Sequence, residues 1–177
     1  ISAVLAMYLG YSFDDIMKSI SEKISNTMPA LLILITVGLM IGSWMIGGTI
    51  PMMIYYGLKI ISPSFLFITA FVVTAIVSVL TGTSWGSAGT IGVAFMGVGI
   101  AMDINLAMVA GAVVSGAYFG DKLSPMSDTT NLSAVSTGVD LYVHIKNQLW
   151  TTGPSFIIAS VVYVIAGRSL NSSGQAI

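Results

Sequence analysis

Charged residues and cysteine are what this sequence has least of. Of its 177 residues, 7% are charged, none is cysteine and one, His144, is a histidine. Soluble globular domains carry about 25% charged residues, so this chain has too little polar surface to face water on every side. Without cysteine it has no disulfides or thiolate metal sites, and one histidine excludes a histidine-rich metal site. The net charge of −1 lacks a basic footprint, so no nucleic-acid partner is expected.

Apolar residues are what the sequence has in excess, at 55% of the chain. This composition predicts an all-α polytopic membrane protein in contact with the lipid bilayer, because helices satisfy their own backbone hydrogen bonds there. The chain starts at Ile1, and no signal peptide can be read from a charged segment before an apolar run. We therefore expect a piece of a larger membrane protein.

The N-terminal quarter predicts two helices in succession. Residues 12–27 alternate apolar and charged positions at helical spacing, and Ser12 with Asp15 is typical of a helix start. We expect an amphipathic helix here, either lying in the membrane interface or leading through water into the membrane. Residues 28–46 are uncharged and would reach about 28 Å as a helix, close to the hydrocarbon thickness of about 30 Å. They predict a transmembrane helix.

The next two segments are interrupted by polar or glycine-rich stretches. Residues 47–62 predict a broken or short membrane helix, because the apolar part is too short to span. Residues 64–102 hold two apolar segments around a polar, uncharged tip at 81–90, and the second segment is also short. This pattern predicts a re-entrant hairpin, with a plain loop between two spans as the alternative.

The C-terminal part predicts a discontinuous helix and a final span. Residues 105–138 form the discontinuous helix, with a break near 120–131 where Pro125 cannot donate a backbone hydrogen bond. Small residues before the break, including Gly116 at the centre of one ridge, recur at i+4 spacing on two adjacent ridges. Such ridges predict close packing against neighbouring helices. Residues 149–166 predict the last transmembrane helix.

The break near 120–131 carries the main candidate site. Charged groups at membrane depth cost about 2.5–3.5 kcal/mol each, so they are rarely there without a function. A helix broken at that depth leaves carbonyls and amides free to bind ions, and hard oxygen ligands suit sodium-like ions. The residues expected to contact the ion are Ser127, Asp128, Thr129, Thr130 and Asn131, with Na+ held at Asp128, Thr129 and Asn131.

Asp128 is the carboxylate that we expect to bind either a proton or Na+. A carboxylate in a poorly solvated site takes up a proton more readily, so one oxygen can serve both ions in turn. That competition is sufficient for exchange. Asp121 is a second candidate for titration. The alternative is that Asp121 and Lys122 pair with each other and cap helix ends at the membrane surface, and the same alternative applies less strongly to Asp128.

The polar tip at 81–90 is the second candidate site. Glycines there let the backbone approach a ligand closely, and Thr81, Thr83 and Ser84 offer hydroxyl groups. The tip could supply the other half of an ion or carboxylate site.

The same tip matches a motif from another class of protein. Residues 82–86 fit G-x-S-x-G, the nucleophile elbow, which leaves an intramembrane serine hydrolase using Ser84 and His144 as an alternative. That elbow needs a strand before the serine, and the apolar run at 65–80 is too long for one. The hydrolase therefore stays an alternative to the ion exchange expected at the break, for which no catalytic residues are needed.

Three stretches of the chain resemble one known family. They are residues 47–58 (GGTIPMMIYYGL), 82–86 (GTSWG) and 116–132 (GAYFGDKLSPMSDTTNL). Together they are similar to the NhaC family of sodium/proton antiporters, which includes sodium-coupled malate/lactate antiporters. The resemblance extends over about 28–166.

The resemblance implies a repeat like those of the ion-transporter superfamily. In that fold two inverted repeats each carry a re-entrant hairpin and a discontinuous helix, whose tips meet at the membrane midplane. Carried over to this sequence, 81–84 is the hairpin tip and 127–131 the unwound helix. Family members are much longer than this chain, so a second repeat of the same full-length chain is an expected partner, and a homodimer stays open.

The function implied by the resemblance is exchange of Na+ for H+ across a membrane. The transported ions are then substrates, and no cofactor is expected. A sodium-coupled antiporter of organic acids, malate or lactate, is the alternative. The location implied is an integral position in a prokaryotic plasma membrane.

Overall fold

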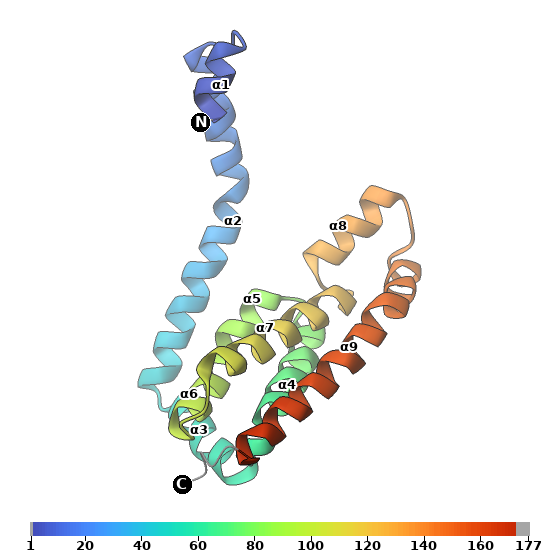
Figure 1. The fold of residues 1–177 in the computed structure, drawn as a ribbon. Helices are drawn as coiled ribbons and strands as arrows, with labels where there is room; N and C mark the ends of the chain where they lie inside the picture. Colours follow the sequence, from blue (N-terminus) through green and yellow to red (C-terminus); the bar gives the residue numbers. More distant parts are fainter. Residues whose placement is uncertain (1, 173–177) are drawn as a thin grey trace. The chain divides into compact units, whose positions relative to one another are not determined.

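The computed structural model describes residues 2–172, and in this part of the chain every regular element is a helix (Figure 1). The predicted all-α class is therefore confirmed. Two compact units divide the chain between Leu39 and Met40. The elements are α1 (Ser2–Tyr8), α2 (Phe13–Ile46), α3 (Thr49–Ile60), η1 (Pro63–Phe65), α4 (Leu66–Thr81), α5 (Ser84–Ser87), η2 (Ala88–Gly92), α6 (Val93–Ala101), α7 (Leu106–Leu123), α8 (Asp128–Thr137) and α9 (Leu141–Ser172).

The start of α2 is capped as its sequence predicts. Ser12 Oγ donates to Asp15 Oδ2 at 2.6 Å and accepts the amide of Asp15 at 3.2 Å, a reciprocal pair that satisfies otherwise free groups at the helix start. α2 then continues without interruption through the segments predicted at 12–27 and 28–46. The amphipathic and the transmembrane segments are thus parts of one helix.

Several helices have the length and composition of membrane spans. Residues Ile35–Ile46 and Thr49–Ile60 pass this test together as a pair bent by 70°, so the short helix predicted within 47–62 is α3. These helices confirm the predicted polytopic membrane class. Three further stretches pass by themselves: Pro63–Thr81, Ser84–Ala101 and Leu141–Ser169.

The second unit is built on close contact between α4 and α7. A Cβ atom added to Gly116 or to Gly120 would collide with backbone atoms of α4, so only glycine allows this approach. The adjacent ridge of α7 faces α9, where Ser115 Oγ lies 2.9 Å from the Tyr163 hydroxyl. Both predicted ridges are thus confirmed as helix contacts. Apolar side chains of α4, α6 and α7 form the core: Leu66, Phe67, Phe71, Phe95, Val98, Val109 and Val113.

The chain reverses between α4 and the helical arm that runs from Ser84 to Ala101. Gly82, with φ +71°, has the left-handed backbone that glycine adopts without strain. Thr83 then caps the second arm, because its Oγ1 accepts the amide of Gly86 at 3.2 Å. Both arms pack on α7. The hairpin predicted over 64–102 needs this reversal, while its depth in the membrane stays a prediction.

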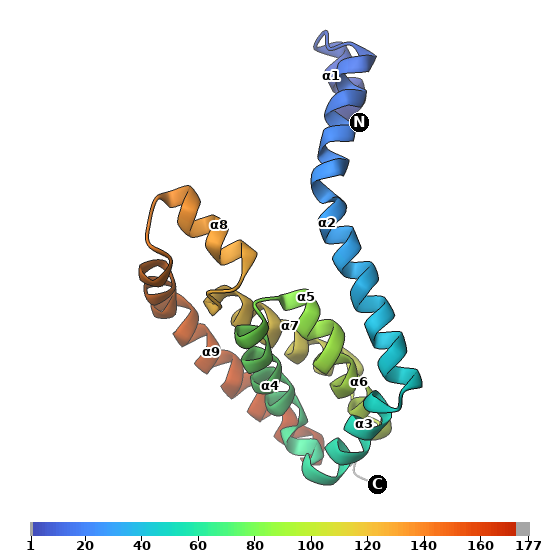
Figure 2. The same cartoon turned by 180° about the vertical axis from the view of Figure 1, so that it is seen from behind.

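The helix predicted over 105–138 corresponds to α7 and α8 on either side of a non-helical segment, 124–127. Figure 2 shows α8 leaving the end of α7 before the chain turns back into α9. α9 begins earlier than the span predicted at 149–166, because Asp140 Oδ1 accepts the amides of Tyr142 and Val143 at 2.9 and 3.2 Å. This cap starts the helix in a polar stretch that hydropathy alone does not mark.

Candidate functional site

Asp121 is the buried carboxylate at the break. It lies near the end of α7 with 7% of its surface exposed. Thr129 Oγ1, on α8, donates to Asp121 Oδ2 at 3.4 Å, and the same hydroxyl lies 2.9 Å from Ser127 Oγ. The structure therefore brings three predicted site residues, Asp121, Ser127 and Thr129, into one hydrogen-bonded group.

Two neighbouring side chains hold the backbone of the break. Thr130 Oγ1 donates to the carbonyls of Asp121 at 3.2 Å and Lys122 at 3.1 Å, which lie in the last turn of α7, where carbonyls lack helical partners. Asn131 Nδ2 donates to the carbonyls of Pro125 and Ser127, both at 2.8 Å. Thr130 and Asn131, predicted as ion contacts, thus shape the site, and Asn131 Oδ1 accepts no hydrogen bond from the described residues.

Asp128, the predicted main carboxylate, lies apart from this group. It is the first residue of α8 and is exposed, and within residues 2–172 its carboxylate makes no hydrogen bond. A negative charge in the first turn is stabilised by the partial positive charge of the helix N-terminus. No hydrogen bond joins its side chain to Thr129 or Asn131, the partners predicted to share Na+ with it.

The alternative of a surface cap at Asp121 and Lys122 does not match the geometry. Asp121 is buried, Lys122 is exposed, and the structure forms no ion pair between them. Asp121 instead accepts from a hydroxyl of the next helix. Its carboxylate therefore faces the break.

The threonines of the tip are used mainly to hold its shape. Thr83 Oγ1 caps the second arm, and Thr81 Oγ1 lies 3.0 Å from Ser87 Oγ, which donates to the Thr83 carbonyl at 2.8 Å. Ser84 is different. It is 7% exposed, and its hydroxyl has no hydrogen-bond partner among the described residues.

Ser84 lines a cavity of about 210 Å³ between the tip and α7. Trp85 and Tyr118 add aromatic walls, and small side chains of α5–η2 and α7 complete the lining. The surface of the cavity is thus almost entirely apolar, and Ser84 is the small polar residue in its lining. It has room for a small organic molecule.

The tip and the break touch each other. A Cβ atom on Gly82 would lie 2.7 Å from the carbonyl carbon of Met126, so the turn of the hairpin rests directly on the break. Near this contact Ser78, on α4, is completely buried, and its Oγ donates to the carbonyl of Ala117 on α7 at 2.6 Å. The two predicted sites are therefore adjacent parts of one region.

Sequence reasoning missed Ser78 and Ser124. Ser124 is also completely buried, and its hydroxyl accepts the amide of Met126 at 3.2 Å inside the break. The available signal for Ser78 was a hydroxyl within the otherwise apolar run of α4, where a polar side chain needs a partner.

The serine hydrolase alternative lacks the local structure it requires. Ser84 follows a helix, α4, where a nucleophile elbow needs a strand. Among the described residues no hydrogen bond joins Ser84 to His144, which lies in the first turn of α9. Within the described residues Ser84 therefore has no base bonded to it.

Several known proteins are similar to this chain over most of its length. The model of the Na+/H+ antiporter family matches residues 116–177, a range that includes the break. An uncharacterized Na+/H+ antiporter of Haemophilus influenzae is 65% identical over 97% of this chain and 37% of its own length. No solved structure matches.

Two further relatives carry specific names. The malate-2H+/Na+-lactate antiporter of Bacillus subtilis is 44% identical over 94% of this chain and 36% of its own length. The Na+/H+ antiporter NhaC of Alkalihalophilus pseudofirmus is 44% identical over 98% of this chain and 37% of its own length. The chain thus spans little more than a third of the length of these relatives.

These relatives are named as antiporters, and none of the three is named as an enzyme. Their bacterial origin and the apolar helices identify an integral membrane protein of a prokaryotic plasma membrane. The identities extend over almost the whole chain, and the family model covers the break that carries Asp121. Over almost its whole length the chain is similar to Na+/H+ antiporters, those of the NhaC family among them, and residues 116–177 match the Na+/H+ antiporter family model.

Proposed function

We propose that this chain forms part of the ion pathway of an antiporter that exchanges Na+ for H+, with Asp121 at its centre. The observation that carries the proposal is a carboxylate, 7% exposed, at the end of a broken helix and beside the hydroxyls of Ser127 and Thr129. An ionisable group within the membrane helices of a protein costs several kcal/mol of free energy and is commonly part of an ion path. The names of the relatives support the same exchange.

Asp121 can hold a proton or Na+, but not both at once. A proton bonded to a carboxylate oxygen and a Na+ ion coordinated by it each compensate the negative charge, and both use the same oxygen atoms. In the sodium-bound form the hydroxyl oxygens of Ser127 and Thr129 can turn their lone pairs to the ion. Binding of one ion then requires release of the other, which is the basis of exchange.

The other predicted residues have supporting roles in this proposal. Asn131 Oδ1 is available as a further oxygen ligand, and Thr130 keeps the end of α7 in place. Asp128 adds an exposed negative charge at the start of α8, which attracts cations to this region. A second, inverted repeat of the full-length protein would supply the opposing tip.

Full-length antiporter in vesicles, with a pH-sensitive dye inside, tests the role of Asp121. We expect Asp121→Asn to abolish sodium-driven proton movement, because the amide cannot exchange a proton for Na+. Asp128→Asn should leave reduced exchange, and Asp103→Asn, an exposed carboxylate next to α6, should leave full exchange. Full exchange by Asp121→Asn would contradict the proposal. Loss of exchange only in Asp128→Asn would show that Asp128 is the carboxylate that binds the ions.

A second candidate function is sodium-coupled exchange of small organic acids. The cavity at Ser84 favours it, because a buried hydroxyl beside aromatic walls can bind the polar and apolar parts of such a molecule. One relative is named as a malate/lactate antiporter. Malate or lactate added to the same vesicles should then change the Na+ flux in the wild type but not in Ser84→Ala. An equal response of both proteins would contradict this candidate.

A further inference from the structure

Exposed charged residues mark one end of the second unit. Lys59 lies near the end of α3, Asp103 follows α6, and Arg168 lies near the end of α9. A Cβ atom on Gly167 would collide with the carbonyl of Ser64, so α9 ends beside the turn that follows α3. The ends of α3, α6 and α9 lie together at the lower end of this unit in Figure 1. Charges that flank apolar helices are typical of a membrane–water interface. We therefore place a membrane–water interface at this end of the second unit.

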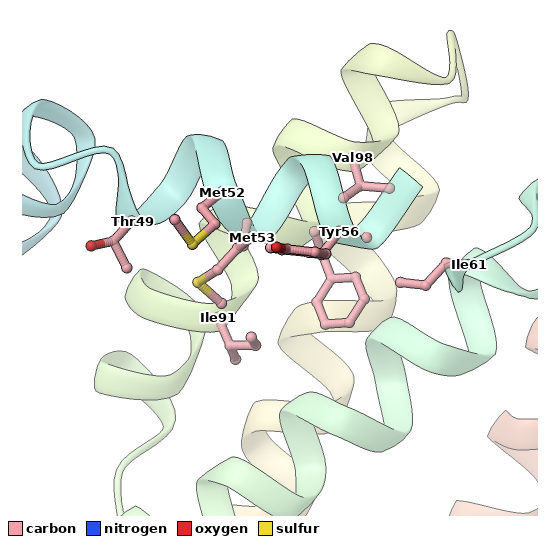
Figure 3. A pocket seen from close by; sticks show the side chains of 10 residues that line it. Thr49, Met52, Met53, Tyr56, Ile61, Ile91 and Val98 are labelled. Carbon is pink, nitrogen blue, oxygen red and sulfur yellow. The ribbon is translucent and has the colours of Figure 1, made fainter. Parts of the chain in front are cut away.

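An apolar cavity lies between α3 and the second arm of the hairpin, close to this end. The two elements approach at glycines, and a Cβ atom on Gly57 would lie 2.8 Å from Val98 Cγ2. The cavity beside this contact has a volume of about 370 Å³ and is called the α3–α6 cavity below. Figure 3 shows Met53 pointing from α3 toward Ile91, with Met52 and Tyr56 on the same helix beside it. Its lining is almost entirely hydrocarbon and thioether.

A cation lies next to the α3–α6 cavity. Lys59 Nζ sits 4.4 Å from the centre of the Tyr55 ring, and Tyr55 packs edge-on against Tyr56, with ring centres 5.4 Å apart. Tyr56 lines the cavity, so two tyrosine rings in edge-to-face contact connect the ammonium group to its wall. Lys59 is exposed and forms no ion pair within the described residues. The cavity therefore combines an apolar interior with one positive charge beside it, at an interface.

The apolar lining of the cavity decides between two kinds of occupant, a peptide segment and a hydrocarbon chain. A non-helical peptide would bring backbone amides and carbonyls that these apolar walls cannot satisfy. A hydrocarbon chain is slender and carries no such groups.

We propose that the α3–α6 cavity binds one acyl chain of an anionic phospholipid, whose phosphate is held by Lys59. The lipid supplies both chemistries that the site presents: an apolar tail for the cavity and a negative charge for the ammonium group. The aromatic pair at the mouth lies at the depth where Tyr side chains meet lipid headgroups. This inference is independent of the ion exchange proposed at Asp121.

Native mass spectrometry of the delipidated full-length antiporter, titrated with phosphatidylglycerol or phosphatidylcholine, tests the proposal. We expect phosphatidylglycerol to bind more tightly, and Lys59→Gln to weaken it about fivefold, the effect of one basic residue near a lipid headgroup. Lys146→Gln, at the opposite end of α9, should leave the affinity for phosphatidylglycerol unchanged.

Met53→Trp should fill the cavity and abolish the bound lipid, whereas Leu58→Trp, on the same helix but outside the lining, should retain it. Equal binding of the two lipids, or retention by Met53→Trp, would overturn the proposal.

A second variant covers the case in which Met53→Trp does not fold. Met53→Cys can be placed in a full-length background without other cysteines and treated with a lipid-soluble maleimide. We expect the thiol to react in the delipidated protein and to be protected by phosphatidylglycerol. A thiol that is unreactive without lipid would show that another segment of the protein fills the cavity. That result, or reaction unaffected by phosphatidylglycerol, contradicts the proposal.

Discussion

The break between α7 and α8 and the tip between α4 and α5 are both polar interruptions of apolar helices, but they satisfy their polar groups differently. In the break, hydroxyls bond across to the neighbouring helix, as Thr129 does to the carboxylate of Asp121. In the tip, Thr81 and Thr83 bond within their own turn. A carboxylate in an apolar setting needs donors from outside its own helix, whereas neutral hydroxyls can be satisfied locally. The break is therefore suited to hold a changing charge, and the tip to keep a shape.

The strongest test of this comparison removes the contact that holds the two regions together. Gly120→Leu should destabilise the full-length protein by at least about 3 kcal/mol, because its side chain would collide with the backbone of α4 at Ala75 and Val79. Gly111→Ala is the control, since a Cβ there meets only the Tyr163 hydroxyl, at 3.9 Å. Thermal unfolding in detergent measures both. A stable Gly120→Leu protein would mean that α4 and α7 do not pack as described.

A smaller effect is expected where the tip rests on the break. Gly82→Ala should cost about 2–3 kcal/mol, because alanine is strained at φ +71° and its Cβ would overlap the backbone of Met126. Gly138→Ala has nearly the same strain, at φ +67°, but meets nothing within 4 Å. The difference between their melting temperatures isolates the contact between tip and break. Equal shifts would show that the two regions are independent.

The chemistry of the break can be tested without changing its charge. Thr129→Val removes the hydroxyl that donates to Asp121 and should raise the Na+ concentration for half-maximal exchange about tenfold, as expected for a hydrogen bond to a charged group. Ser133→Ala, one turn further along α8, is the control because its hydroxyl bonds only to the Thr129 carbonyl. Sodium titration in vesicles gives the result. An unchanged Na+ dependence in Thr129→Val would remove that hydroxyl from the site.

The smallest expected effect is in the tip. Thr83→Ala removes the cap of the second arm and should cost about 1 kcal/mol of stability, with the Na+ dependence of exchange unchanged. Thr83→Ser keeps the hydroxyl and should restore the stability. A large change in Na+ dependence with little loss of stability would place Thr83 in the ion site, and the comparison drawn above would then be wrong.

Much of the fold can be predicted from particular residues. Pro125 lacks a backbone donor and predicts the break, and the small residues around Gly116 predict the close contact with α4. Both features depend on residues close together in the sequence, so the sequence is sufficient to predict them. The start of α9 is harder to predict because its cap, Asp140, lies in a polar stretch before the apolar run.

The candidate site was only partly predictable. The group of hydroxyl, amide and carboxylate residues between Asp121 and Asn131 is visible in the sequence, and the structure gathers several of them around the break. Which oxygens bond to which backbone carbonyls depends on how the segment 124–127 returns the first turn of α8 to the end of α7. Thr130, for example, reaches carbonyls eight and nine positions before it. Spacing in the sequence does not reveal such a return.

The sequence by itself determined the class of this protein: too few charges for a water-soluble surface, apolar helices with two polar interruptions, and motifs shared with one transporter family. Only the tertiary structure decided which of two nearby carboxylates is buried. Asp121 is covered because Gly116 and Gly120 let α4 lie against the same end of α7, while Asp128 begins a helix that points away from this contact. Burial is a property of packed neighbours, so two acidic residues seven positions apart can have opposite surroundings although their local sequences look equally polar.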